Sequence, residues 1–170
     1  KEERINELKS GFDRTKEISP KELSDASNLL ITNDLKSLES VDVFIVTVPT
    51  PIDKNKRPDF KSIKSASQMI GDILSNRSIK TSNVFPVVIY ESTVYPGATE
   101  EICVPILEKF SGLKYNKNLF CGYSPERINP GDNSHRFSDI VKVTSGSCPE
   151  VAEWVDQLYG SIINAGTYKA

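Results

Sequence analysis

Hydroxyl groups at two places in the sequence could contact a bound cofactor or a reacting water. Residues 48–51 (VPTP) hold Thr50 between two prolines, which restrict the backbone on either side of it. Residues 91–99 (ESTVYPGAT) place Ser92 and Thr93 before a Pro-Gly turn, where the N–H groups of a following helix could attract an anion. Taken alone, the first segment fits a rigid loop equally well, and the second fits a plain turn with a capping threonine.

A third segment, residues 122–132 (GYSPERINPGD), combines a carboxylate with a guanidinium. Glu126 could act as a general base toward water, and Arg127 could hold a phosphate or a carboxylate through paired N–H groups. Neighbouring loop charges of opposite sign are more often a solvated pair, and this remains the competing interpretation of the two residues.

The strands that must position these segments are predicted from short runs of β-branched and aromatic residues. The run 41–48 is nearly continuous and is predicted to be buried on both faces. The predicted strands lie at residues 29–32, 41–48, 85–90, 119–123, 140–144 and 162–163. Each chemistry-bearing segment begins in or directly after one of them.

Helices between these strands are predicted from apolar residues spaced three and four positions apart. Ser19, Pro20 and Glu22 form a capping pattern that predicts a helix start. A helix over residues 98–110 should be kinked by Pro105. The chain is predicted to open in the middle of a helix, with Ile5 and Leu8 on one face. The other predicted helical segments begin near Asp34, Ile63 and Pro149, and Gly112 is a predicted helix stop.

Strands that alternate with helices predict an α/β fold, a doubly wound (Rossmann-like) and mostly parallel sheet covered on both faces. In such sheets ligands bind at the carboxyl ends of the strands. The three segments are therefore expected to meet at one edge of the sheet.

Length and charge exclude several classes of protein. A chain of 170 residues is long enough for one sizeable core, and its net charge of −2 offers no basic face for nucleic acid. No apolar run approaches the roughly 20 residues that span a bilayer, and the start carries no signal-peptide pattern. We expect a cytoplasmic protein with neither nucleic acid nor a membrane as partner.

Cysteine and histidine are too sparse to predict a metal site. The three cysteines, Cys103, Cys121 and Cys148, are widely spaced and odd in number, which favours reduced structural thiols. Cys121 lies nearest the candidate site and is interpreted as a small buried hydrophobe. His135, the only histidine, has no second ligand pattern around it, so no metal is expected.

The three segments, in this order and at these distances, resemble the N-terminal NAD-binding domain of the UDP-glucose/GDP-mannose dehydrogenase family. Residues 4–15 also resemble the part of that domain that follows its second strand. The run 126–132 (ERINPGD), with His135 nearby, resembles the branch that acts on UDP-N-acetylhexosamines. The resemblance extends over essentially the whole chain.

The resemblance implies an enzyme that oxidises the C6 hydroxyl of a UDP-N-acetylhexosamine to the carboxylate in two NAD-dependent steps, with a cysteine thiohemiacetal and thioester between them. It also implies a homodimer and a role in capsule or O-antigen polysaccharide biosynthesis. Thr93 and Glu126 would be catalytic, with Glu126 activating water for thioester hydrolysis. The implied cofactor-binding residues are Arg4, Val48, Pro49, Thr50, Pro51, Ser92 and Thr93, and the implied substrate-binding residues are Glu126, Arg127, Ile128 and Asn129.

Several family features have no counterpart in this sequence. It contains neither the glycine-rich turn of a dinucleotide site nor the acidic residue that follows the second strand, and no cysteine matches the family nucleophile. The resemblance thus implies that residues 1–170 are a partial NAD-binding domain that lacks the first βαβ segment, the central helix and the UDP-binding domain. We expect such a fragment to be inactive alone, with an open sheet edge that a longer chain or a second copy covers.

Two alternatives to this function remain open. A two-electron dehydrogenase of the same fold would need no downstream cysteine. A nonenzymatic nucleotide-sugar-binding module would keep the pocket without the chemistry, because a fold by itself does not determine function.

Overall fold

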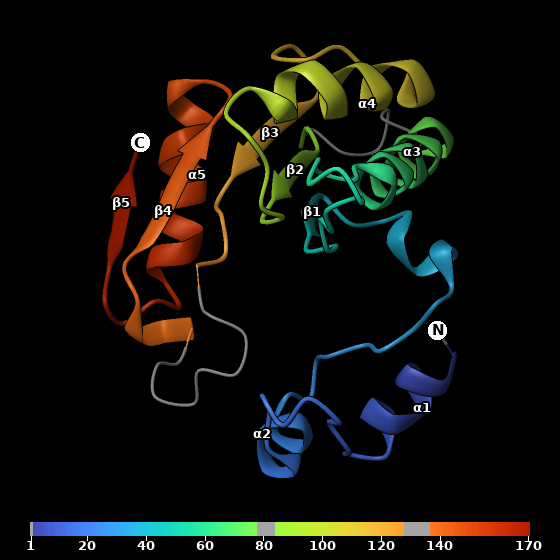
Figure 1. Ribbon diagram of the computed structural model, residues 1–170, viewed down its shortest axis with the longest axis vertical. Helices are drawn as coiled ribbons and strands as arrows, with labels where there is room; N and C mark the ends of the chain where they lie inside the picture. The colour runs from blue at the N-terminus through green and yellow to red at the C-terminus, as the bar shows by residue number, and fades with distance from the viewer. Residues whose placement is uncertain (1, 78–83, 128–136) are drawn as a thin grey trace. The chain divides into compact units, whose positions relative to one another are not determined.

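The computed structural model describes residues 2–77, 84–127 and 137–170, and the chain divides into two compact units, Lys1–Glu39 and Ser40–Ala170 (Figure 1). The first unit contains α1 (Glu2–Lys9), α2 (Pro20–Asp25) and a 3-10 turn, η1 (Leu35–Leu38). The predicted capping pattern is confirmed, because Ser19 accepts a hydrogen bond from the backbone N–H of Glu22 and Glu22 caps the backbone of Ser19 in return.

The predicted strand at residues 29–32 is wrong. These residues adopt no regular structure, and Leu29 and Leu30 are 56% and 69% exposed. A strand needs a neighbour to accept and donate its backbone hydrogen bonds, and the described residues of the first unit contain no other strand. The β propensity of residues 29–32 is therefore not enough to form a strand without a neighbouring strand.

The second unit is built on a five-stranded sheet with the order β1-β2-β3-β4-β5 (Figure 1). Strands β1, β2 and β3 are parallel neighbours, β4 runs antiparallel to β3, and β5 runs parallel to β4. The strands are β1 (Val43–Val46), β2 (Val87–Tyr90), β3 (Phe120–Tyr123), β4 (Lys142–Gly146) and β5 (Thr167–Lys169). The prediction of a mostly parallel α/β sheet is confirmed.

Because β4 is antiparallel to β3, the chain re-enters the sheet from the edge at which β3 ends. A parallel neighbour would need a crossover to return the chain to the starting edge, whereas an antiparallel one does not. The described part of the connection between β3 and β4 contains a 3-10 turn, η4 (Phe137–Asp139).

Helices cover both faces of this sheet. Along β2, Tyr90 bonds to Ser67 of α3 (Lys61–Asn76) through its hydroxyl at 2.7 Å, whereas Ile89 belongs to the core formed with Val155 and Tyr159. Successive strand residues point to opposite faces, so α3 and α5 (Pro149–Gly160) lie on opposite sides, as Figure 1 shows. The helix α4 (Val104–Ser111) packs beside α3. This is the doubly wound arrangement that the sequence predicts.

Two predicted strands differ from the observed ones in burial or position. On β1, Phe44 and Val46 are buried but Ile45 is 47% exposed, so the prediction of burial on both faces is wrong. Among the described residues β1 pairs only with β2, and the edge position leaves one side chain uncovered. The strand predicted at 162–163 is a turn after α5, in which Ile163 alone is buried, and the strand itself follows at β5.

The helix predicted over residues 98–110 is distorted just before Pro105. It begins as a π-helical segment, η3 (Thr99–Cys103), in which the N–H of Val104 donates to the carbonyl of Thr99. α4 then continues the same helix with Pro105 near its start. Because proline has no backbone N–H, a carbonyl of the preceding turn lacks its usual donor, and the wider π-helical turn lies at this point. The helix ends at Gly112, which adopts a left-handed conformation with φ 73° and confirms the predicted stop.

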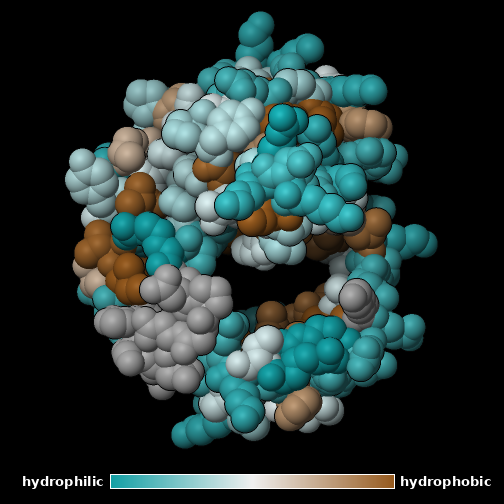
Figure 2. Space-filling view, in the orientation of Figure 1, coloured by the Kyte–Doolittle hydropathy of each residue, from teal (hydrophilic) through white to brown (hydrophobic). Residues whose placement is uncertain are grey.

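Exposed apolar side chains are scattered over the side of the molecule seen in Figure 2. Figure 2 shows brown areas at several separate places among larger teal areas on the side in view. Scattered exposure of this kind is normal for folded proteins. Within the described ranges no helix is both long and apolar enough to cross a membrane.

Candidate active site

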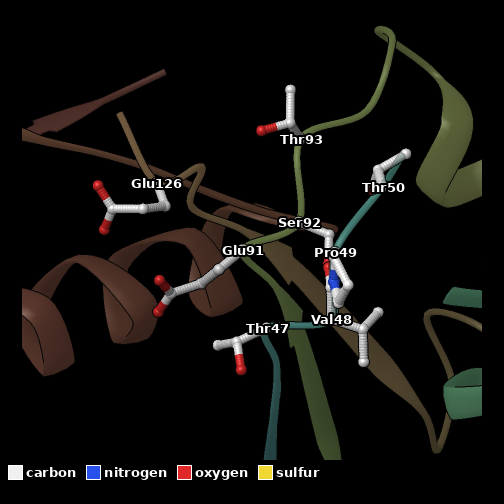
Figure 3. Close-up of a pocket in the computed structure, with 8 residues that line it drawn as sticks. All are labelled: Thr47, Val48, Pro49, Thr50, Glu91, Ser92, Thr93 and Glu126. Carbon is white, nitrogen blue, oxygen red and sulfur yellow. The ribbon is translucent and has the colours of Figure 1, made fainter. Parts of the chain in front are cut away.

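The ends of the three parallel strands meet at one pocket of about 360 Å³ (Figure 3). Its volume is at the lower end for ligand pockets, which suits one part of a dinucleotide or nucleotide sugar. The eight lining residues are Thr47, Val48, Pro49, Thr50, Glu91, Ser92, Thr93 and Glu126. The predicted meeting of the three segments at the carboxyl edge of the sheet is confirmed.

Hydrogen bonds between the strand ends fix the floor of this pocket. The hydroxyl of Ser92 donates to the carbonyl of Val48 at 2.6 Å. The backbone N–H of Glu91 donates to Val46 at 2.9 Å, and that of Glu126 donates to Glu91 at 3.2 Å. Ser92 therefore joins the segments that follow β1 and β2, rather than presenting a free donor to a ligand.

Three threonines, Thr47, Thr50 and Thr93, line the pocket, and Thr47 was not among the predicted site residues. The Thr50 oxygen is buried and has no hydrogen-bond partner among the described residues. A buried polar atom without a partner is rare in a folded protein, and a bound group would satisfy it. Thr93 is exposed at the mouth of the pocket, and Figure 3 shows its hydroxyl directed to the side where Glu126 lies. A buried hydroxyl without a partner and an exposed hydroxyl at the mouth together suit a polar cofactor at the strand ends.

A buried charge cluster lies behind the pocket and reaches it through Glu91, and sequence reasoning missed this cluster. Glu91 accepts hydrogen bonds from Lys142 at 3.0 Å and from the hydroxyl of Tyr159 at 2.5 Å. Burial, together with the carboxylate of Glu91, raises the pKa of Tyr159 well above its usual range, so this hydroxyl remains a donor. The signal was present at Glu91, which is a carboxylate that directly follows a buried strand.

Of the predicted site residues described in the second unit, Pro51 and Arg127 do not line the pocket. Pro51 is exposed beyond it. The guanidinium of Arg127 donates to the carbonyl of Val141, and that of Arg4 donates to Asp13 within the first unit. Ile128 and Asn129 lie outside the described residues, as does His135. Their assigned roles remain predictions.

The cysteines behave as structural residues. Cys103 and Cys121 are buried, Cys148 is partly buried, and all three are free thiols. Burial raises the pKa of both buried thiols, which keeps them protonated and unreactive. Across the described ranges no group of three or more histidine, cysteine, aspartate or glutamate residues could hold a metal ion.

The sheet, its helical cover and a polar pocket at the strand ends define a Rossmann-type α/β domain with a site for a dinucleotide. A family model described as "UDP-glucose/GDP-mannose dehydrogenase family, NAD binding domain" matches residues 1–163. The chain belongs to the UDP-glucose/GDP-mannose dehydrogenase family and corresponds to its NAD-binding domain. This confirms the predicted family and the predicted cofactor.

Curated relatives resemble the chain over almost all of its length. A UDP-N-acetyl-D-glucosamine 6-dehydrogenase of Pseudomonas aeruginosa is 59% identical over 98% of this chain and 38% of its own. A protein of the same name from Salmonella typhi is 47% identical over 98% of this chain and 37% of its own. The chain thus spans well under half the length of these relatives.

A solved structure supports the fold. The GDP-mannose dehydrogenase of Pseudomonas aeruginosa superposes with a TM-score of 0.82 at 21% identity, over 95% of this chain and 37% of that one. Identity this low indicates a shared fold only.

Proposed function

We propose that this chain is the cofactor-binding part of a longer enzyme that oxidises a UDP-N-acetylhexosamine at C6 with NAD. The support comes from the family match together with the two relatives named as UDP-N-acetyl-D-glucosamine 6-dehydrogenases. The reaction takes four electrons in two steps, from alcohol to carboxylate, and reduces two NAD. A cysteine on a part of the enzyme beyond these residues adds to the intermediate aldehyde to form a thiohemiacetal. The second oxidation converts this to a thioester, which water then hydrolyses. The product serves surface polysaccharide synthesis, and the enzyme acts as a homodimer.

The observation that carries this proposal is the position of Glu126. It lines the same pocket as Thr50 and Thr93. Glu126 follows β3, which lies next to β2 and Thr93, whereas Thr50 follows β1 on the other side of β2. Thioester hydrolysis needs a base beside a positioned water. In the proposed arrangement Thr50 and Thr93 contact the cofactor, Thr93 also orients the water, and Glu126 takes its proton. Arg127 with the backbone at 128–129 faces the sugar nucleotide.

The test is a count of NADH formed by the full-length protein with UDP-N-acetylglucosamine, UDP-N-acetylgalactosamine and UDP-glucose. The wild type should form two NADH per N-acetylated sugar. Glu126→Gln should lower the turnover number on the order of 100-fold, because the amide cannot accept the proton of water. Glu153→Gln is the matched control, since Glu153 is paired with Lys169 on another part of the surface, and it should behave like the wild type.

Either of two results would contradict the proposal. A folded full-length protein that forms no NADH with any of the three sugars is not this dehydrogenase. One NADH per sugar would instead favour a two-electron enzyme.

A further inference from the structure

A buried lysine lies behind the pocket and contacts two of its acidic groups. Lys142 is only 5% exposed, and its Nζ lies 3.0 Å from a carboxylate oxygen of Glu91 and 3.9 Å from one of Glu126. Lysine is almost never buried without a partner, because an ammonium loses its hydration on burial. The carboxylates of Glu91 and Glu126, which line the pocket, compensate for the lost hydration of the ammonium.

The direction of β4 brings Lys142 to this position. Gly122 pairs with Gly146 and Tyr123 with Ser145, so the same antiparallel register, continued past the strand end, leads to Lys142 opposite Glu126. A parallel strand at this place would start at the far edge of the sheet. The reversal therefore delivers a cation to the edge where the pocket lies.

The ammonium is held in place from several sides. The ring of Phe137 lies 4.6 Å from Nζ and that of Tyr159 lies 5.3 Å away, distances at which a cation is attracted to the face of an aromatic ring. Tyr159 also donates its hydroxyl to the second oxygen of Glu91, which prevents this carboxylate from turning away. Glu91 and Tyr159 thus fix the position of the Lys142 ammonium.

Glu126 is the exposed member of the cluster. Its side chain is 40% exposed, compared with 10% for Glu91. A buried ion pair contributes little net stability compared with well-packed apolar residues, because desolvation offsets the attraction. A contribution to stability is therefore a poor explanation for the presence of Lys142 beside Glu126.

We propose that Lys142 is a positioning residue for Glu126. Its fixed ammonium holds the carboxylate of Glu126 in the pocket as an oriented anion, ready to accept the proton of the hydrolytic water. Glu91 and Tyr159 act through Lys142 by fixing the ammonium. The inference rests on the proposed function, in which Glu126 is the base.

The proposal assigns Lys142 to one step of the reaction. In hydrolysis, the water oxygen bonds to the thioester carbonyl carbon, its proton passes to Glu126, and the carbon–sulfur bond breaks to release the thiolate and the sugar acid. The two preceding hydride transfers to NAD do not use the Glu126 carboxylate as a base. Loss of Lys142 should therefore slow hydrolysis and spare both oxidations.

The experiment is rapid mixing of full-length Lys142→Met with NAD and the N-acetylated UDP-sugar that the wild type oxidises. NADH should appear in a burst of two per active site at close to the wild-type rate. Steady turnover should then fall on the order of 10-fold to 100-fold, as expected when a catalytic group is misplaced by about 1 Å. Intact mass spectrometry of the quenched enzyme should show the acyl adduct of the sugar.

Two further variants control for folding. Lys169→Met removes an exposed lysine that is also paired with a glutamate, Glu153, and it should show neither the slow phase nor the adduct. If Lys142→Met does not fold, the double variant Glu91→Gln/Lys142→Met removes both buried charges and keeps a hydrogen-bond acceptor for Tyr159. It should show the same burst, slow phase and adduct.

The outcomes separate this inference from the proposed function. If the wild type forms two NADH per sugar but the Lys142 variants lose burst and steady rate in equal proportion, the lysine is merely structural and the inference is overturned alone. Unchanged steady turnover in the Lys142 variants also overturns it alone. If the wild type forms no NADH, the proposed function fails and the inference fails with it.

Discussion

Asp13 shows how a single side chain orders a loop that has no regular structure. Its carboxylate accepts hydrogen bonds from the guanidinium of Arg4, from the hydroxyl of Thr15 at 2.7 Å, and from the backbone N–H groups of Thr15, Glu17 and Ile18. These donors favour the ionised form, so the pKa of Asp13 lies well below its usual range, with Arg4 the largest cause. Among the described residues of the first unit, Asp13 alone is buried.

The stability of this loop should depend on pH. A carboxyl group whose pKa is lower in the folded state contributes fully above its unfolded pKa, about 3.9, and the contribution is lost as the pH falls toward the folded value. Hydrogen-exchange protection of the Glu17 and Ile18 amides should therefore decrease between about pH 5 and about pH 2.5. In Asp13→Asn protection should be low throughout. Wild-type protection that does not change with pH would contradict this assignment.

Among the secondary-structure elements, β4 and α5 approach each other closely at Gly146. A methyl group built there would lie 2.3 Å from the backbone nitrogen of Ala152, and the main chain of α5 cannot move aside as a flexible side chain would. The glycine is required by this contact, since its φ angle is not in the left-handed region. The start of α5 can therefore lie directly against the sheet, with Val155 and Tyr159 buried in the core.

Gly146→Ala should lower the free energy of unfolding by about 3 kcal/mol, because the added carbon forces α5 away from β4. Denaturant titration of the purified protein measures this change. Gly160→Ala is the matched control, since a methyl group there meets nothing within 4 Å at the end of the same helix. That control should leave stability unchanged or raise it by roughly 0.5–1 kcal/mol. Equal effects of the two substitutions would refute the role of close packing.

At the scale of the whole chain, the sequence predicts the fold and the three strand-end segments that form the pocket. The alternation of buried strands and amphipathic helices is set by local residue order, so the sheet, its two-sided cover and the meeting of the three strand ends were predictable. The Ser19 cap and the Gly112 stop are equally local signals. These features depend on residues close together in the chain.

The missed features depend on residues far apart in the chain. The charge cluster of Glu91, Lys142 and Tyr159 forms only because β4 runs antiparallel to β3. No local sequence pattern predicts this change of direction. The false strand at residues 29–32 failed for a related reason, since strand formation requires a partner that a short apolar run cannot reveal. Sequence periodicity reports how an element is buried, but not what lies beside it.

The pairings of β4 with β3 and with β5 close shorter stretches of chain than the parallel pairings among β1, β2 and β3. Tyr123 pairs with Ser145 and Lys142 with Thr167, whereas Val43 pairs with Val87. Because shorter loops cost less entropy to close, β3, β4, α5 and β5 should form early in folding. In pulse-labelled hydrogen exchange during refolding, the amides of Lys142 and Ala170 should become protected before those of Val87 and Glu91. The opposite order would contradict this expectation.

This difference in loop length gives the charge cluster an order of assembly. Lys142, Tyr159 and Glu126 belong to the part that should fold early, because β3 pairs with β4 over an equally short stretch, whereas Glu91 joins when β2 pairs with its parallel neighbours. The ammonium would then exist for a time without its nearer carboxylate. The arrival of Glu91 supplies that carboxylate, so the pairing of β2 is also the step that completes the pocket.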